Sequence, residues 1–179
     1  MSYSVHVNAN QVWLGLLILR VSVGVTMIAH GYNHVFRGGR IPGTGRWFES
    51  LGMKPGKLHA WLASLTELAA GLGLVVGLLT PLAAGACAGV MLVALITNHR
   101  KNGFFIFRPG EGYEYVLNLF VACIAIGALG AGDWSLDNAV GFSLHGMAGF
   151  WTALAIGVGG TVLLLATFWR PPAPKPAEA

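Results

Sequence analysis

The chain has 179 residues, of which 55% are hydrophobic and only 10% are charged, and its formal net charge is +4. A soluble domain of this length needs far more charge to cover its surface, so the composition predicts an all-α integral membrane protein. The basic residues lie in loops between apolar stretches, and they therefore indicate no nucleic-acid partner.

Five apolar stretches approach or reach the roughly 20 residues that a spanning helix needs. In chain order they are residues 12–36, 58–79, 82–98, 113–132 and 149–169. Thr80 and Pro81 alone join the second stretch to the third, which predicts a tight hairpin with the proline as helix stop and start. The proline-rich residues 170–179 predict a disordered cytoplasmic tail.

The distribution of basic residues sets the expected topology. With five spans, one side of the membrane receives residues 1–11, the Thr80–Pro81 turn and residues 131–148, which contain no Lys or Arg. The positive-inside rule then places the N-terminus outside and the C-terminus in the cytoplasm of a bacterial plasma membrane. The other side receives ten basic residues: Arg37, Arg40, Arg46, Lys54, Lys57, Arg100, Lys101, Arg108, Arg170 and Lys175.

Arg20 and Glu67 are ionisable residues inside two of the predicted spans. Ionisable groups cannot face lipid cheaply, so both are expected to point into the bundle. Helical rise places Arg20 at roughly 12 Å and Glu67 at roughly 18 Å from the outer ends of their spans. That gap can be bridged by two long side chains, so the sequence predicts an intramembrane ion pair, with a structural role favoured over a catalytic one.

A second group of polar residues is expected near the cytoplasmic surface. On helical wheels these residues fall on, or at the edge of, the small-residue faces of the spans, and the faces are expected to meet in the bundle interior. They form a candidate basin for a quinone headgroup or its protons, because histidine exchanges protons near neutral pH. Its members are His30, His34, His59, Asn98, His99, Glu111, Glu114 and Asn118.

Other ligands of this basin are less favoured. His30 and His34 have the i, i+4 spacing of a shared metal ligand, but the histidines and glutamates do not follow the pattern of known di-metal bundles. We therefore expect no metal site, no haem and no covalently bound cofactor, and the candidate ligand is a quinone headgroup or a small anion. The alternative is that these histidines are amphipathic residues at the membrane interface without a functional role.

Two amphipathic segments flank the basin. Residues 43–57 place Trp47, Phe48, Leu51 and Met53 on one edge, and residues 102–115 contain an aromatic run broken by Pro109 and Gly110. Both are candidate lids or docking surfaces, and simple anchoring in the lipid interface is an equal alternative.

Several motifs in chain order resemble the DoxX family of small bacterial membrane proteins. They are Arg20, Gly24, His30-Gly31, "WFESLG" from Trp47, "ELAAGLGLVVGLLTPLAA" from Glu67, "NGFF" from Asn102, "GYEYVLNL" from Gly112 and "GAGDWSLD" from Gly130. The resemblance covers residues 12–138 and implies a four-helix transmembrane bundle with a link to respiratory or sulfur redox chemistry. Residues 149–169 would then be an additional fifth helix, and His34 and Pro81 depart from the usual family pattern.

Three functions follow as alternatives. The first is a membrane subunit of a quinone-linked oxidoreductase, working with a partner redox protein because the chain has no nucleotide, flavin or cluster-binding motif. The second is a non-catalytic anchor or accessory subunit that docks a partner in a larger respiratory assembly. The third, a small permease, is less favoured because no inverted repeat or broken helix is evident. No catalytic residue is assigned.

Overall fold

The computed structural model describes residues 8–172, and these residues form a helical bundle without a named β-strand. The expectations for residues 1–7 and for residues 173–179 of the tail lie outside the described part. The main helices are α1 (Ala9–Phe36), α2 (Arg40–Ser50), α3 (Gly56–Val76), α4 (Thr80–Ala94), α5 (Glu114–Leu129), α6 (Leu136–Ala139), α7 (Gly146–Leu154) and α8 (Gly160–Phe168). The π-helical turn η1 (Leu95–His99) and the 3₁₀ turn η2 (Arg100–Asn102) extend α4, and the π-helical turn η3 (Ala155–Gly159) joins α7 to α8.

The predicted multi-pass helical bundle is confirmed. Within the described residues, four continuous helical segments are long and apolar enough to cross a membrane: Ala9–Phe36, Gly56–Val76, Thr80–Asn102 and Gly146–Phe168. The remaining apolar helix, α5, has 16 residues and a length of about 24 Å, which makes it a marginal span. The marginal helix is therefore the fourth in the chain, whereas the additional C-terminal helix has full length.

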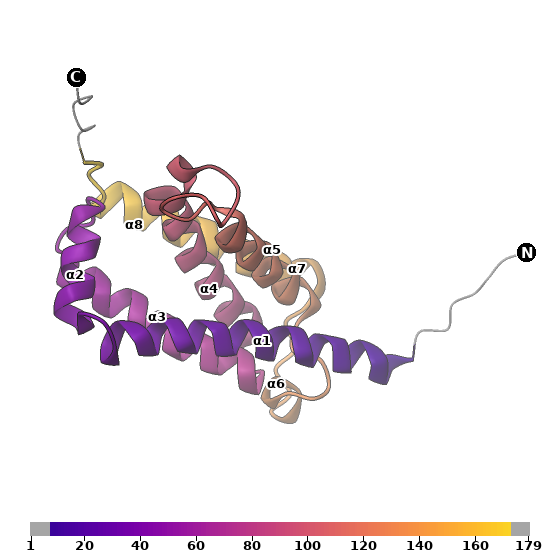
Figure 1. Ribbon diagram of the computed structural model, residues 1–179. Coiled ribbons are helices and arrows are strands. Elements are labelled where there is room, and N and C mark those ends of the chain that lie inside the picture. The colour runs from indigo at the N-terminus through magenta and orange to yellow at the C-terminus, as the bar shows by residue number, and fades with distance from the viewer. Residues whose placement is uncertain (1–7, 173–179) are drawn as a thin grey trace, which may run out of the picture.

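The helices form two groups that meet at one end of the molecule. Figure 1 shows α1 beside α3 along one side, with α4, α5 and the α7–α8 segment on the other side. The first residues of α1 and the end of α8 lie at opposite ends of the bundle (Figure 1). Helix α2 lies across the end where α8 finishes.

Small residues bring the helices into contact. A Cβ added to Gly24 of α1 would lie 2.6 Å from the Gly71 carbonyl oxygen of α3, so the two backbones touch at this point. In the other group, a Cβ on Gly85 of α4 would lie 2.9 Å from the carbonyl oxygen of Ala153 in α7. Such approaches allow packing forces to hold helices together where no water has to be excluded.

The C-terminal helix is fastened to the segment that follows α2. The backbone of Trp169 pairs with Met53 in an isolated antiparallel bridge, and its indole Nε1 donates to the Leu51 carbonyl at 2.9 Å. The Arg170 amide donates to the Gly52 carbonyl at 2.9 Å. Arg170, where the predicted disordered tail begins, is therefore held by a backbone hydrogen bond.

The predicted ion pair between Arg20 and Glu67 is wrong. Arg20 is fully buried and lies about two helical turns from Glu67, beside the C-terminal end of α3. Its Nη1 donates to the carbonyls of Leu74 and Val75 at 2.9 Å each, and Nη2 donates to the Trp134 carbonyl. The depth estimate failed because α1 is longer than a bilayer requires, so its first residues are a poor reference for membrane depth.

Asp137 supplies the complementary charge at this end of the molecule. Its carboxylate accepts from the amides of Leu79 at 2.6 Å and Thr80 at 2.9 Å, which are free donors at the start of α4. Leu79 is held there in a left-handed backbone conformation (φ 48°), and Gly77 ends α3 in the same region of backbone space. The positive Arg20 at a helix C-terminus and the negative Asp137 at a helix N-terminus thus each interact favourably with the local helix dipole.

Candidate functional site

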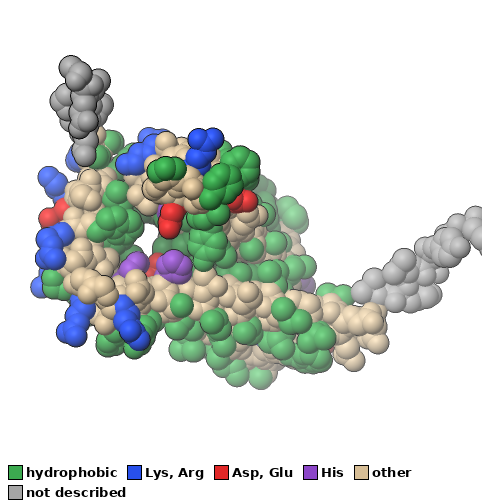
Figure 2. Space-filling view, in the orientation of Figure 1, with side chains coloured by type: hydrophobic (Ala, Val, Ile, Leu, Met, Phe, Trp, Pro, Cys, Tyr) green, Lys and Arg blue, Asp and Glu red, His purple; other side chains and the backbone are tan. Residues whose placement is uncertain are grey.

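A cavity of about 430 Å³ lies between the two helix groups at the end covered by α2. Figure 2 shows an opening on this face, with histidine and acidic side chains along its edge and basic side chains gathered around the same end. The walls come from α1, α2, α3, α4 with η1, the start of α5, and the C-terminal helix. The cavity is therefore a property of the whole bundle, and no two helices enclose it alone.

The structure places six of the eight predicted basin residues on this cavity: His30, His34, His59, Asn98, His99 and Glu111. The two others do not line it. The Glu114 carboxylate accepts from the Ile106 amide at 3.2 Å, and Asn118 donates to the Glu114 carbonyl at 2.9 Å, so both serve the start of α5 and the preceding loop. That the six residues bind a ligand stays a prediction.

Glu67 is a buried acidic group on the cavity wall. Its side chain is 3% exposed, and Oε2 lies 3.1 Å from His34 Nδ1, within ion-pair distance. The two atoms are not aligned for a hydrogen bond, and each is without another partner among the described residues. A buried carboxylate oxygen in this state is costly, so the geometry favours a further donor from the cavity.

His59 is a second polar group with spare hydrogen-bonding capacity. It is 2% exposed, and its ring lies between Phe48 of α2 and Phe168 of α8, with ring centroids at 6.4 Å and 5.1 Å. Its Nε2 has no hydrogen-bond partner among the described residues, although the residue lines the cavity. The aromatic neighbours fix the imidazole in place, and the free nitrogen can donate to or accept from a ligand or water.

The π-helical turn η1 positions Asn98 and His99. Insertion of a π turn changes which side chains face the bundle, and such turns are frequent at functional sites. His99 Nδ1 lies 2.9 Å from the Glu111 carbonyl and Nε2 lies 3.3 Å from Asn98 Nδ2. These contacts tie the loop before α5 to the end of α4 and keep both side chains at the cavity.

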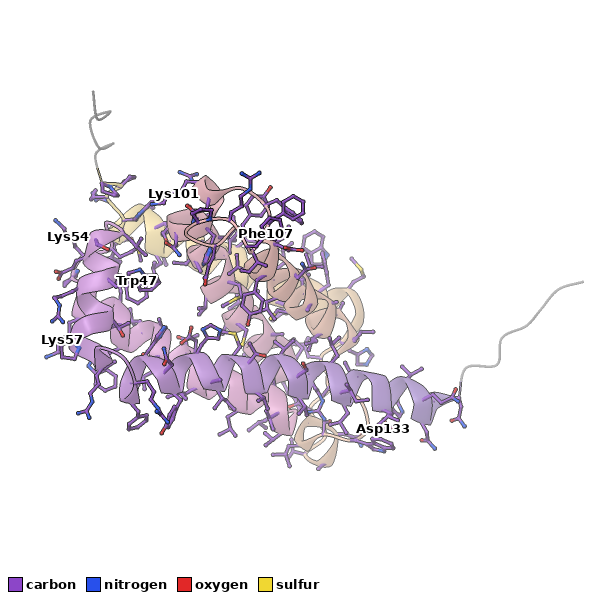
Figure 3. All side chains as sticks on the ribbon, in the orientation of Figure 1. Trp47, Lys54, Lys57, Lys101, Phe107 and Asp133 are labelled. Atoms are coloured by element: carbon purple, nitrogen blue, oxygen red, sulfur yellow. The ribbon has the colours of Figure 1, made fainter. Side chains whose placement is uncertain are left out.

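Aromatic residues of α2 and the 103–112 loop lie on either side of the opening. Figure 3 shows the Trp47 side chain directed from α2 towards the interior, whereas Phe107 lies on the outside of the loop. Trp47 lines the cavity, and Phe107 is 78% exposed. The segment around Trp47 thus covers part of the cavity, as a lid would, while the Phe107 side chain points away from it.

The C-terminal helix contributes wall residues that the sequence analysis did not assign to the site. They are Ile156, Gly160, Thr161 and Leu164. The Thr161 hydroxyl donates to the Gly89 carbonyl of α4 at 3.1 Å, which fixes this wall to the central helix. The four-residue spacing of Gly149, Ala153 and Gly157 signals a close helix contact, but it does not indicate which helix the segment contacts.

Within residues 8–172, no three His, Cys, Asp or Glu side chains come together in a way that could hold a metal ion.

Neither a curated protein nor a solved structure matches the chain. The DoxX family model matches residues 15–100, which include most of α1 and all of α2, α3, α4 and the π-helical turn η1. Arg20, Gly24, His30 and Glu67 lie inside the matched range, while the motifs from Asn102 to Asp137 and the C-terminal helix lie beyond it. Residues 15–100, a little under half of the chain, are therefore similar to the DoxX family.

Proposed function

We propose that this chain is a membrane subunit of a quinone-linked redox system and that its cavity holds the quinone headgroup. The observation that carries the proposal is a cavity of about 430 Å³ into which Glu67 and His59, both nearly fully buried, present polar atoms that have no hydrogen-bond partner within residues 8–172. Small-molecule sites have this size and combine apolar walls with a few polar groups that fix orientation.

The walls suit an apolar ring with polar substituents. Between the polar groups the cavity is lined by aliphatic and aromatic side chains, which include Leu62, Val90, Met91 and Leu164. A ring can pack on these residues while its carbonyl oxygens accept from an imidazole N–H or, in the reduced form, its hydroxyl groups donate to a carboxylate. Members of this family are often linked to redox or quinone systems, which supports the same assignment. Electrons would come from a partner redox protein.

The binding proposal can be tested with a decyl-substituted benzoquinone and the purified protein in lipid nanodiscs. Quinones quench tryptophan fluorescence, and Trp47 lines the cavity, so saturable quenching is expected. His30→Ala should weaken the apparent Kd about tenfold, because one hydrogen bond to a ligand oxygen is lost. His145→Ala is the matched control, since this exposed histidine lines a different cavity at the opposite end.

Thermal unfolding of the same preparations separates binding from folding. His30 is exposed and makes one long contact, 3.5 Å from the Tyr115 hydroxyl, so His30→Ala should leave the Tm nearly unchanged. Quenching that does not saturate in the unmodified protein, or an equal change in both histidine variants, would overturn the proposal.

The basic end of the bundle is proposed to face the cytoplasm. Figure 3 shows Lys54, Lys57 and Lys101 at one end of the molecule and Asp133 at the other, which fits the positive-inside rule. In intact cells, a membrane-impermeant maleimide should label Asp133→Cys but not Lys101→Cys, which should react only after lysis. The native Cys87 and Cys123 are fully buried and provide an unreactive background. Labelling of Lys101→Cys in intact cells would show that the basic end faces outwards and would contradict the proposed orientation.

A further inference from the structure

Glu67 lacks the counter-charge that the sequence predicted, because Arg20 bonds to other groups. The guanidinium of Arg20 is used by three carbonyls at the opposite end of the bundle. Glu67 keeps His34 as a neighbour, through a contact that is not aligned for a hydrogen bond. Its Oε2 therefore has an unused acceptor position in the cavity.

The depth of Glu67 shows which part of a ligand can reach it. It lies eight residues, or about 12 Å, along α3 from His59. A ligand whose polar end contacts Glu67 must insert past Leu62 and Ala63, which line the cavity between these two levels. Glu67 therefore contacts a ligand atom that lies deeper in the cavity than His59, which is nearer the α2 lid.

A carboxylate accepts hydrogen bonds and cannot donate them. A quinone carbonyl offers only lone pairs, so it would face Glu67 acceptor to acceptor. A hydroquinone hydroxyl, in contrast, donates to the free oxygen. His30 lies one helical turn from His34 on α1, a spacing of about 6 Å, which is comparable to the separation of two para oxygens on one ring.

We propose that Glu67 makes this cavity selective for the reduced ligand, a neutral aromatic diol whose inner hydroxyl donates to Oε2. The inference rests on the proposed function and deepens it, because it names the redox form that the site holds. It concerns binding alone, and no electron or proton is transferred within it. His34 lies beside the same carboxylate oxygen, and the apolar walls hold the ring.

The decisive experiment compares the two redox forms of one probe. Anaerobic calorimetry should measure the Kd of decyl-hydroquinone and of decyl-benzoquinone in nanodiscs, at one pH. The unmodified protein should bind the hydroquinone about tenfold more tightly, the effect of one charge-assisted hydrogen bond. Glu67→Gln presents an amide that can donate to a carbonyl, so the preference should disappear or reverse.

Asp133→Asn is the matched control, because it neutralises an exposed carboxylate at the far end of the bundle and should keep the preference. Equal Kd values for the two forms in the unmodified protein would overturn the inference while leaving quinone binding intact. Absence of binding by either form would instead remove the proposed function. If Glu67→Gln fails to fold, the preference of the unmodified protein still decides.

A lipophilic cation is the competing ligand for a buried carboxylate among aromatic residues. Tetraphenylphosphonium should therefore be titrated into the same preparations. Displacement of the hydroquinone by this cation, with loss of cation binding in Glu67→Gln, would show that Glu67 serves a cation and would overturn the assignment to a diol.

Discussion

Replacing Arg20 by leucine is expected to lower the free energy of unfolding by about 3–5 kcal/mol, the effect of breaking one side of a buried charged network. The variant would leave the carbonyls of Leu74, Val75 and Trp134 without their donor. It would also leave the buried Asp137 carboxylate without the cation that compensates its charge. The measurement is unfolding in mixed micelles followed by far-UV circular dichroism.

A double-mutant cycle distinguishes this role from the ion pair that the sequence suggested. Arg20→Leu combined with Asp137→Asn should show a coupling energy clearly different from zero, because both residues stabilise the turn between α3 and α4. Arg20→Leu combined with Glu67→Gln should be additive, since the two side chains have no common partner. Strong coupling between Arg20 and Glu67 would contradict the arrangement described above.

Gly24→Val should destabilise the contact between α1 and α3 by about 1–3 kcal/mol or more, as overpacking does. The new Cβ would lie 2.6 Å from the Gly71 carbonyl oxygen and 2.9 Å from a methyl carbon of Val75. Because the carbonyl is backbone, the helices must separate. That separation would also displace the α1 wall of the cavity, so ligand binding should weaken together with the Tm.

Gly15→Val is the matched control for this prediction. Gly15 lies in the same helix, and an added Cβ there would meet no atom within 4 Å. Both substitutions replace glycine by valine in a helix, so differences in helix propensity cancel. A change in Tm of equal size in the two variants would show that backbone approach at Gly24 is not what determines stability.

The candidate cavity could be anticipated in part. Helical periodicity and depth brought His30, His34, His59, Asn98, His99 and Glu111 to one level, and the structure finds them on one cavity. Glu114 and Asn118 were included by the same argument, but local hydrogen bonds hold them at the start of α5. A helical wheel does not record these local bonds, because they depend on the path of the preceding loop.

Hydropathy, run length and the positions of basic residues determined by themselves that this chain is a multi-pass helical bundle, because lipid restricts spanning segments to long apolar helices. Partner choice among polar groups was decided only by the tertiary structure. Arg20 bonds to carbonyls and Glu67 lies beside His34 because the register of α1 against α3 is set where Gly24 meets Gly71. The hydrogen bond from Trp169 to Leu51 likewise joins segments that are distant in sequence. It holds the C-terminal helix, which lies beyond the family-matched residues, against the cavity.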